Sequence, residues 1–152
     1  MNRRGIHNDE KNAFRHRTVF APRFGDIDAV GHVNNARYSS YLEEARVSYA
    51  KEVLGWNGIL DTLNIVVADL HLEFKNPIFL QDEVLILSRI SEVGGRSFTF
   101  RYLIYALRDG QEVLAARAST ALVYYDYRSG RSARIPDDWR SAISAYEDSV
   151  PE

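Results

Sequence analysis

The chain of 152 residues contains no cysteine. This absence excludes disulfides, thiolate nucleophiles and zinc sites built on cysteine, and it is consistent with a reducing cytoplasm. An excess of basic charge is missing too, because the net charge is −2. No apolar run reaches the length of a membrane span, and residues 1–17 lack the apolar stretch of a secretory signal. We therefore expect a cytoplasmic protein that binds neither nucleic acid nor membrane.

Several signatures of enzyme sites are absent as well. The sequence has no Gly-x-Ser-x-Gly motif of serine hydrolases and no glycine-rich loop that could hold phosphate groups. Its four histidines, at positions 7, 16, 32 and 71, do not stand at metal-ligand spacing with carboxylates. We expect neither a metal nor a cofactor.

The length and the hydrophobic content of 45% fit one globular domain with a real core. We place this domain at residues 15–147. The polar, charged residues 1–14 are expected to form a flexible N-terminal arm. No linker, internal repeat or low-complexity tract divides the remainder.

Residues 37–54 carry the periodicity of an α-helix. Apolar and aromatic side chains recur every three or four positions, at Tyr38, Tyr41, Leu42, Ala45, Tyr49 and Val53. Asn34 or Asn35 is a suitable N-cap, and Gly55 and Gly58 mark the exit. Because the stripe contains large residues, we expect this helix to be deeply packed.

Strand patterns surround this helix, and a second, short helix is expected at 137–146, after Pro136. Asp109-Gly110 is a strong hairpin signal. One helix between a first strand and a four-strand meander predicts an α+β domain, an antiparallel sheet wrapped around the helix. The last strands are apolar at both parities, so we also expect a homo-oligomer, a dimer or a tetramer. The predicted strands are 16–24, 63–74, 83–93, 97–107 and 112–127.

The connector before the long helix is unusually rich in functional groups. It runs Asp26-Ile-Asp-Ala-Val-Gly-His-Val-Asn-Asn35 and brings two carboxylates, an imidazole and two carboxamides close together. A carboxylate beside a helix N-terminus can act in hydrolysis, because the first N–H groups of a helix stabilise developing negative charge.

This motif, followed by Tyr38, Tyr41, Glu43 and Arg46, resembles that of the hotdog-fold thioesterases of the 4-hydroxybenzoyl-CoA thioesterase type. Related acyl-CoA thioesterases and plant acyl-carrier-protein thioesterases are similar too. The order of strand, helix and four strands extends the resemblance over residues 16–128. It implies a hotdog fold and hydrolysis of acyl-CoA or acyl-carrier-protein thioesters, with coenzyme A entering only as part of the substrate.

The resemblance also assigns roles to residues. The catalytic carboxylate of the benzoyl-CoA type maps onto Asp28, and its backbone oxyanion donor maps onto Asn35. The plant-type histidine maps onto His32, although Val30 replaces an asparagine of the plant-type pattern. Asp28 would be either the nucleophile or the general base. The alternative for Asp28 is a side chain that only caps a turn.

The other candidate residues have structural alternatives. His32 could orient Asp28 or be an ordinary loop histidine. Asp26 and Asn34 are expected to build the turn and the helix cap. Glu43 could assist at the site or pair with Arg46 one turn later. The tyrosines at 38 and 41 would line an acyl pocket or simply the core. Arginines that could contact CoA phosphates stand at positions 96, 131 and 134.

Two other functions compete with thioester hydrolysis. A hotdog dehydratase or hydratase would need a histidine and an acid across the site, and this chain shows no His-Phe-Pro signature. A non-catalytic acyl-CoA binding module would not need the aspartate at position 28. Both alternatives predict that no free thiol is released from an acyl thioester.

Overall fold

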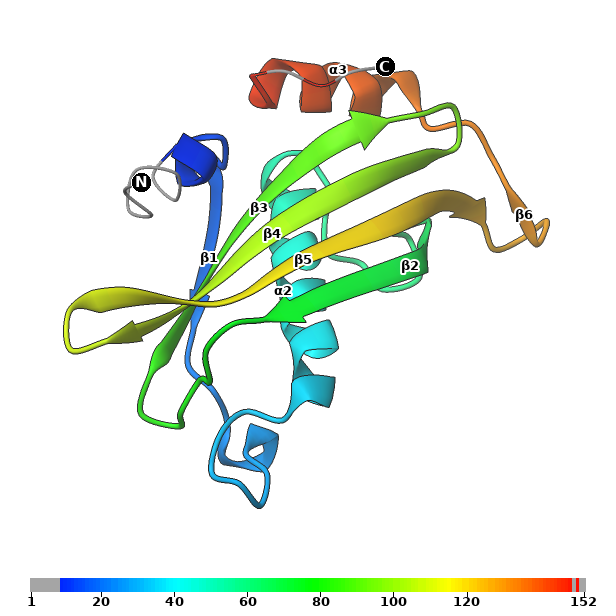
Figure 1. Ribbon diagram of the computed structural model, residues 1–152. Helices are drawn as coiled ribbons and strands as arrows, with labels where there is room; N and C mark the ends of the chain where they lie inside the picture. The colour runs from blue at the N-terminus through cyan, green and yellow to red at the C-terminus, as the bar shows by residue number, and fades with distance from the viewer. Residues whose placement is uncertain (1–8, 149, 151–152) are drawn as a thin grey trace.

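The computed structural model describes residues 9–148 and residue 150, and it consists of a curled antiparallel sheet around one long helix (Figure 1). The spatial order of strands in the sheet is β1-β3-β4-β5-β2, and the short β6 pairs with β5. This arrangement confirms the predicted α+β architecture. The strands are β1 (His16–Phe20), β2 (Ile65–Phe74), β3 (Glu83–Val93), β4 (Ser97–Arg108), β5 (Gln111–Asp126) and β6 (Arg131–Ser132).

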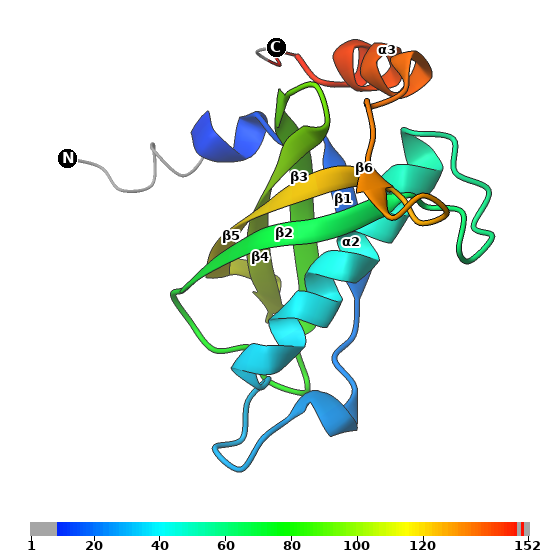
Figure 2. The same cartoon turned by 90° about the vertical axis from the view of Figure 1, so that its right-hand side faces the viewer.

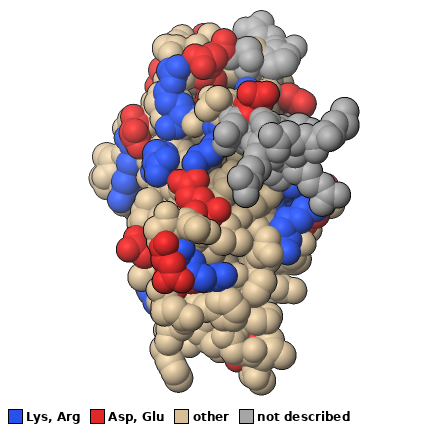
Figure 3. Space-filling view, turned by 60° about the vertical axis from the view of Figure 1, so that its left-hand side comes forward, with Lys and Arg blue, Asp and Glu red and all other residues tan. Residues whose placement is uncertain are grey.

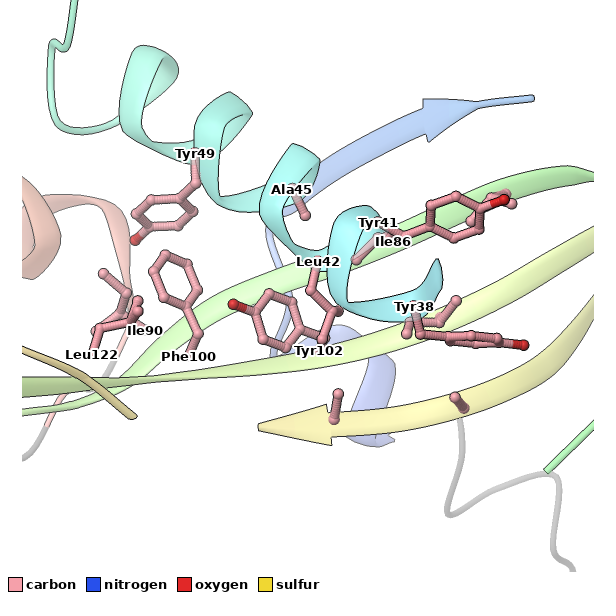
Figure 4. Packing of buried hydrophobic residues seen from close by; sticks show 14 of the residues in the cluster. Tyr38, Tyr41, Leu42, Ala45, Tyr49, Ile86, Ile90, Phe100, Tyr102 and Leu122 are labelled. Atoms are coloured by element: carbon pink, nitrogen blue, oxygen red, sulfur yellow. The ribbon is translucent and has the colours of Figure 1, made fainter. Parts of the chain in front are cut away.

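The long helix α2 (Tyr38–Glu52) crosses the concave face of the sheet (Figure 2). Its buried stripe contains Tyr38, Leu42, Ala45 and Tyr49, as the periodicity predicted. These side chains meet aromatic rings that rise from β4, where the Tyr49 and Phe100 ring centroids lie 4.9 Å apart (Figure 4). Edge-to-face aromatic pairs favour such spacings, so the helix is seated on the sheet with a definite orientation.

Turn chemistry defines the two central hairpins. Asp109 and Gly110 have φ values of 51° and 73°, the left-handed conformation that a tight two-residue turn between β4 and β5 requires. Between β3 and β4, the N–H of Gly94 donates to the carbonyl of Ser97 at 2.7 Å. The predicted strand 83–93 matches β3, and the predicted terminal helix matches α3 (Asp137–Tyr146).

The first strand is shorter than its sequence pattern predicted. The expected strand 16–24 ends at Phe20, and residues Phe24–Asp26 form the 3-10 turn η1 instead. Pro22 has no backbone N–H with which to continue strand pairing. Beyond it, the Asp26 carboxylate accepts from the backbone N–H of Arg23 at 2.9 Å and turns the chain.

The convex face of the sheet carries a second, smaller apolar cluster of Leu85, Leu87, Leu103 and Tyr105, against which Phe14 packs. Residues 9–12 are helical and lie beside it. Two ion pairs attach this segment to β5: Glu10 to Arg117 at 2.9 Å, and Lys11 to Glu112. Charges of both signs are interspersed on the face shown in Figure 3. Residues 1–8 of the expected arm lie outside the described residues, so its boundary stays a prediction.

The helix α3 covers the end of the curled sheet where α2 finishes (Figure 1). Trp139 packs against Phe98 and Tyr124, and the chain after α3 inserts Glu147 into the core. One Glu147 oxygen accepts from the Tyr49 hydroxyl at 2.8 Å and from the Ile90 N–H at 3.0 Å. Burial raises the pKa of this carboxyl. Among the described residues, none of the helices combines the length and apolar character that crossing a membrane requires.

Replacement of Glu147 by Gln should change how stability depends on pH. The raised pKa means that the native state holds its proton at pH values where the unfolded chain has lost it, so stability falls as pH rises above the ordinary value of 4.5. Gln keeps an acceptor for both hydrogen bonds and removes the titration. Urea unfolding at pH 4 and pH 7 should show Glu147→Gln gaining stability relative to wild type with rising pH. Parallel profiles would contradict this account.

Candidate functional site

The candidate site is the loop between η1 and α2, at the N-terminal end of the helix (Figure 1). Ile27 and Val33 form an isolated antiparallel bridge that closes the loop at its base. Inside it, the Asp28 N–H donates to the His32 carbonyl at 3.1 Å, and the Gly31 N–H donates to the Asp28 carbonyl at 3.0 Å. Gly31 has a φ of 88°, which a side chain would disfavour. The predicted site residues therefore occupy a compact, internally hydrogen-bonded turn.

Asp28 lies within this turn and is half-buried. Its Oδ1 accepts from the Val30 N–H at 3.0 Å, so the carboxylate does take part in the turn. Among the described residues, no other hydrogen bond or ion pair engages the carboxylate, and Oδ2 is uncommitted. An oriented carboxylate with one uncommitted oxygen is suited to attack a carbonyl or to accept a proton from water.

Asp26 has a different environment although it lies only two residues away. Its Oδ2 accepts from the Tyr41 hydroxyl at 2.7 Å as well as from the Arg23 N–H, and Arg37 Nε lies 3.9 Å from Oδ1. Burial, followed by this hydrogen bond, raises the pKa of Tyr41. Asp26 thus ties the loop to the first turn of α2, which agrees with the structural role expected for it.

The two asparagines play different parts at the start of the helix. The Asn34 side chain accepts from the Ala36 N–H at 2.9 Å and caps the 3-10 turn η2 (Asn35–Arg37), which leads directly into α2. Asn35 is solvent-exposed. Its backbone N–H has no acceptor in the described part of the chain. Such an unsatisfied N–H at a helical N-terminus is positioned to receive a negatively charged oxygen.

A hollow of about 230 Å³ lies beside these groups, lined by His32, Asn35, Tyr38 and Phe74 among others. The Tyr38 and Phe74 rings meet edge to face at 4.9 Å, and burial raises the pKa of Tyr38 to about 12. The centroid of the His32 ring lies 6.2 Å from that of Phe79. In the described residues no hydrogen bond links the side chains of His32 and Asp28. One wall of this hollow comes from the end of β2 and the segment after it. The sequence did not predict this wall, because its one local signal there was the strand break at Asn76-Pro77.

The remaining candidates lie farther along the fold. Glu43 is exposed on α2, and the expected pair with Arg46 is absent among the described residues, because Arg46 turns inward and donates to the Tyr102 hydroxyl at 3.4 Å. Arg96 follows β3 at the opposite end of the sheet and donates to the carbonyl and hydroxyl oxygens of Ser132, at 3.1 Å each. Within one chain, the structure does not bring Arg96 to the loop of Asp28.

Two further arginines were candidates for phosphate contacts. Arg131 lies in β6, and Arg134 lies 3.6 Å from Asp137 at the start of α3. Both share the end of the sheet that holds Arg96, away from the Asp28 loop. The described residues contain no group of three histidine, aspartate or glutamate side chains placed to hold a metal ion.

Replacement of Asp26 by Asn should destabilise the protein. Asn keeps an oxygen that can accept both bonds, from Tyr41 and Arg23, but it lacks the negative charge, and this loss weakens the two bonds by about 1–2 kcal/mol. For a chain of this size the thermal midpoint should fall by roughly 2–8 °C. The matched control is Asp28→Asn, whose single turn hydrogen bond is exposed and contributes less. Equal midpoints for both variants, measured by circular dichroism, would contradict the anchoring role of Asp26.

Comparison with known proteins identifies the family of this chain. The profile of the thioesterase-like superfamily matches residues 22–143. The long-chain acyl-CoA thioesterase FadM of Escherichia coli is 26% identical over 127 residues, which cover 77% of this chain and 88% of FadM. Protein YsmA of Bacillus subtilis is 31% identical over 133 residues, which cover 88% of each chain.

Solved structures agree with this match. A thioesterase from Thermus thermophilus, crystallised with coenzyme A and zinc, superposes with a TM-score of 0.78 at 34% identity and covers 90% of this chain and 97% of its own. A protein from Pseudomonas aeruginosa described as a possible thioesterase gives a TM-score of 0.76 at 29% identity, covering 86% and 99%. These likenesses confirm the predicted hotdog fold, and the chain belongs to the thioesterase-like superfamily.

Proposed function

We propose that this protein hydrolyses acyl-CoA thioesters to a free acid and coenzyme A, with Asp28 as its reacting carboxylate. The observation that carries the proposal is that the short segment leading into α2 holds two groups with free hydrogen-bonding capacity. One is the Asp28 carboxylate with its uncommitted oxygen, and the other is the Asn35 N–H that lacks an acceptor in the described residues. Membership of the thioesterase-like superfamily supports thioester hydrolysis as the class of reaction.

In the general-base route, Asp28 takes a proton from water while the water oxygen attacks the thioester carbonyl carbon. In the nucleophilic route, a carboxylate oxygen attacks this carbon itself and forms a mixed anhydride, which water then hydrolyses. Both routes break the carbon–sulfur bond and release the thiolate of coenzyme A. Both also place negative charge on the carbonyl oxygen, where the Asn35 N–H and the helix dipole would stabilise it.

Coenzyme A is our preferred carrier. FadM acts on long-chain acyl-CoA, and the Thermus thermophilus thioesterase was crystallised with coenzyme A. A chloroplast acyl-carrier-protein thioesterase of Arabidopsis thaliana is a more distant relative, with 23% identity over 128 residues. The hollow beside Tyr38 and Phe74 would receive the start of the acyl group, and His32 borders the same hollow.

We also propose that the functional unit is a homo-oligomer assembled through β2. This strand forms one edge of the main sheet, so its outer backbone groups are available for pairing. It also exposes apolar side chains: Val66 is 39% exposed, Leu70 40% and Phe74 44%. An apolar edge strand next to the candidate site is suited to pair with β2 of a second copy, which would place two sites near one interface.

The first test is the kinetics of Asp28→Asn on a panel of acyl-CoA substrates. Loss of the reacting carboxylate should lower kcat by about 10²–10⁴-fold, since general base catalysis typically contributes this much. Free thiol is measured with a chromogenic disulfide reagent. An unchanged kcat in the folded variant would remove Asp28 from the mechanism. Wild-type binding of acyl-CoA without thiol release would favour the binding module, and loss of an enoyl chromophore without thiol release would favour the hydratase.

The second test is the mass of the particle in solution, measured by light scattering. Val66→Lys places a charge on the proposed β2 interface and should shift the protein toward a monomer. The matched control is Val19→Lys, which changes a valine that is 50% exposed on β1, the opposite edge of the sheet. This control should keep the wild-type mass. If Val66→Lys also keeps it, the oligomer does not form through β2.

A further inference from the structure

A groove runs along the seam between α2 and β2. It consists of two adjoining hollows of about 240 and 460 Å³, which share Glu43, Arg46 and Val67 in their walls. Leu70 lines the smaller hollow, and Trp56 and Leu60 line the larger one. The larger hollow is lined mainly by apolar side chains, whereas the smaller one combines Leu42, Val67 and Leu70 with Ser39, Ser40 and Thr120. The seam can therefore hold a hydrocarbon chain next to polar groups.

Among the described residues that line the two hollows, Arg46 is the one cation. The residue is only 8% exposed, yet it borders both hollows. Its one partner in the described part of the chain is the Tyr102 hydroxyl, at the long distance of 3.4 Å. Tyr102 rises from β4 toward α2 (Figure 4), and its hydroxyl shares a second hydrogen bond, of 2.9 Å, with Thr120. A guanidinium carries five N–H donors, so most of those on Arg46 have no acceptor.

This arrangement leaves a positive charge in the floor of the groove without a counter-ion. The unpartnered nitrogens of Arg46 are not among the fully enclosed side-chain atoms of the described residues, so they open onto the groove, where a ligand can reach them. Arginines this little exposed are ordinarily paired with carboxylates. Glu43 and Asp61 also border the groove, but both are exposed, so water screens their charges, and neither forms an ion pair with Arg46 among the described residues. A carboxylate is the ligand that matches a guanidinium best, because two parallel hydrogen bonds and opposite charges are satisfied together.

The distance from the candidate site to Arg46 suits an acyl chain. Arg46 is eight residues beyond Tyr38, which corresponds to about 12 Å along the axis of α2. The hollow at Tyr38 and the groove at Arg46 both lie on the side of α2 that faces β2. A thioester held at the Asn35 N–H would therefore direct its acyl chain along this seam toward the guanidinium.

We propose that Arg46 binds a carboxylate at the far end of the acyl chain, so that the preferred substrates are CoA monothioesters of dicarboxylic acids. This proposal rests on the thioester hydrolysis proposed above and specifies the acyl group. The methylenes of the chain lie in the groove, and the terminal carboxylate accepts hydrogen bonds from Arg46. Tyr102, which is itself hydrogen-bonded to Thr120, holds the guanidinium.

The test compares three CoA thioesters of equal chain length, over a series of lengths. One ends in a carboxylate, the second carries the methyl ester of that carboxylate, and the third ends in a methyl group. At the best length, wild type should show a kcat/KM about 10- to 100-fold higher for the carboxylate than for its methyl ester, as expected for charge-assisted hydrogen bonds. This comparison needs no variant and so cannot fail through misfolding.

Arg46→Gln then assigns the preference to its residue. The ratio of kcat/KM between carboxylate and methyl ester should fall toward one in this variant. Arg46→Lys, which keeps the charge without the fork of donors, should give an intermediate ratio. A wild-type ratio near one, or a ratio unchanged in folded Arg46→Gln, overturns the proposal while hydrolysis itself stands. Absence of thiol release from all three substrates would instead reject the proposed function.

Discussion

The packing of α2 into the concave face of the sheet is the contact on which the rest of the molecule depends. The buried stripe of the helix meets aromatic side chains from β4, and edge-to-face ring contacts fix how the helix lies. Because these contacts prevent the helix from sliding or rotating on the sheet, its N-terminus is held at one end of the curled sheet. The loop that precedes it is positioned by the same contact.

A second connection transfers this rigidity from the helix to the loop. Asp26 receives hydrogen bonds from the Tyr41 hydroxyl and from the Arg23 N–H, so one carboxylate joins the core helix to the start of the loop. Asp28, two residues later, stays outside this network apart from its own turn. Two aspartates of one motif thus have different environments, and the anchored one holds the loop that carries the other.

Elements with a local cause could be predicted from the sequence. The strand at 83–93 and the helix at 137–146 follow from periodicity and turn residues, and the Asp109-Gly110 hairpin follows from turn chemistry. The sequence was a poorer guide to where individual side chains lie in the tertiary structure. The helical pattern placed Arg46 one turn after Glu43, but only the packed fold shows that it turns inward to Tyr102. Likewise, nothing local indicates that Arg96 and the Asp28 loop lie at opposite ends of one sheet.

The proposed oxyanion donor has a consequence for how this family is compared. The donor at Asn35 is a main-chain group, so nearly any amino acid at this position supplies it equally well, and proline alone cannot. Divergence at position 35 therefore carries little information about activity. The residues that shape the backbone there are more informative: the cap at Asn34, the bridge between Ile27 and Val33, and the left-handed Gly31. Relatives are best compared by whether these three features are retained.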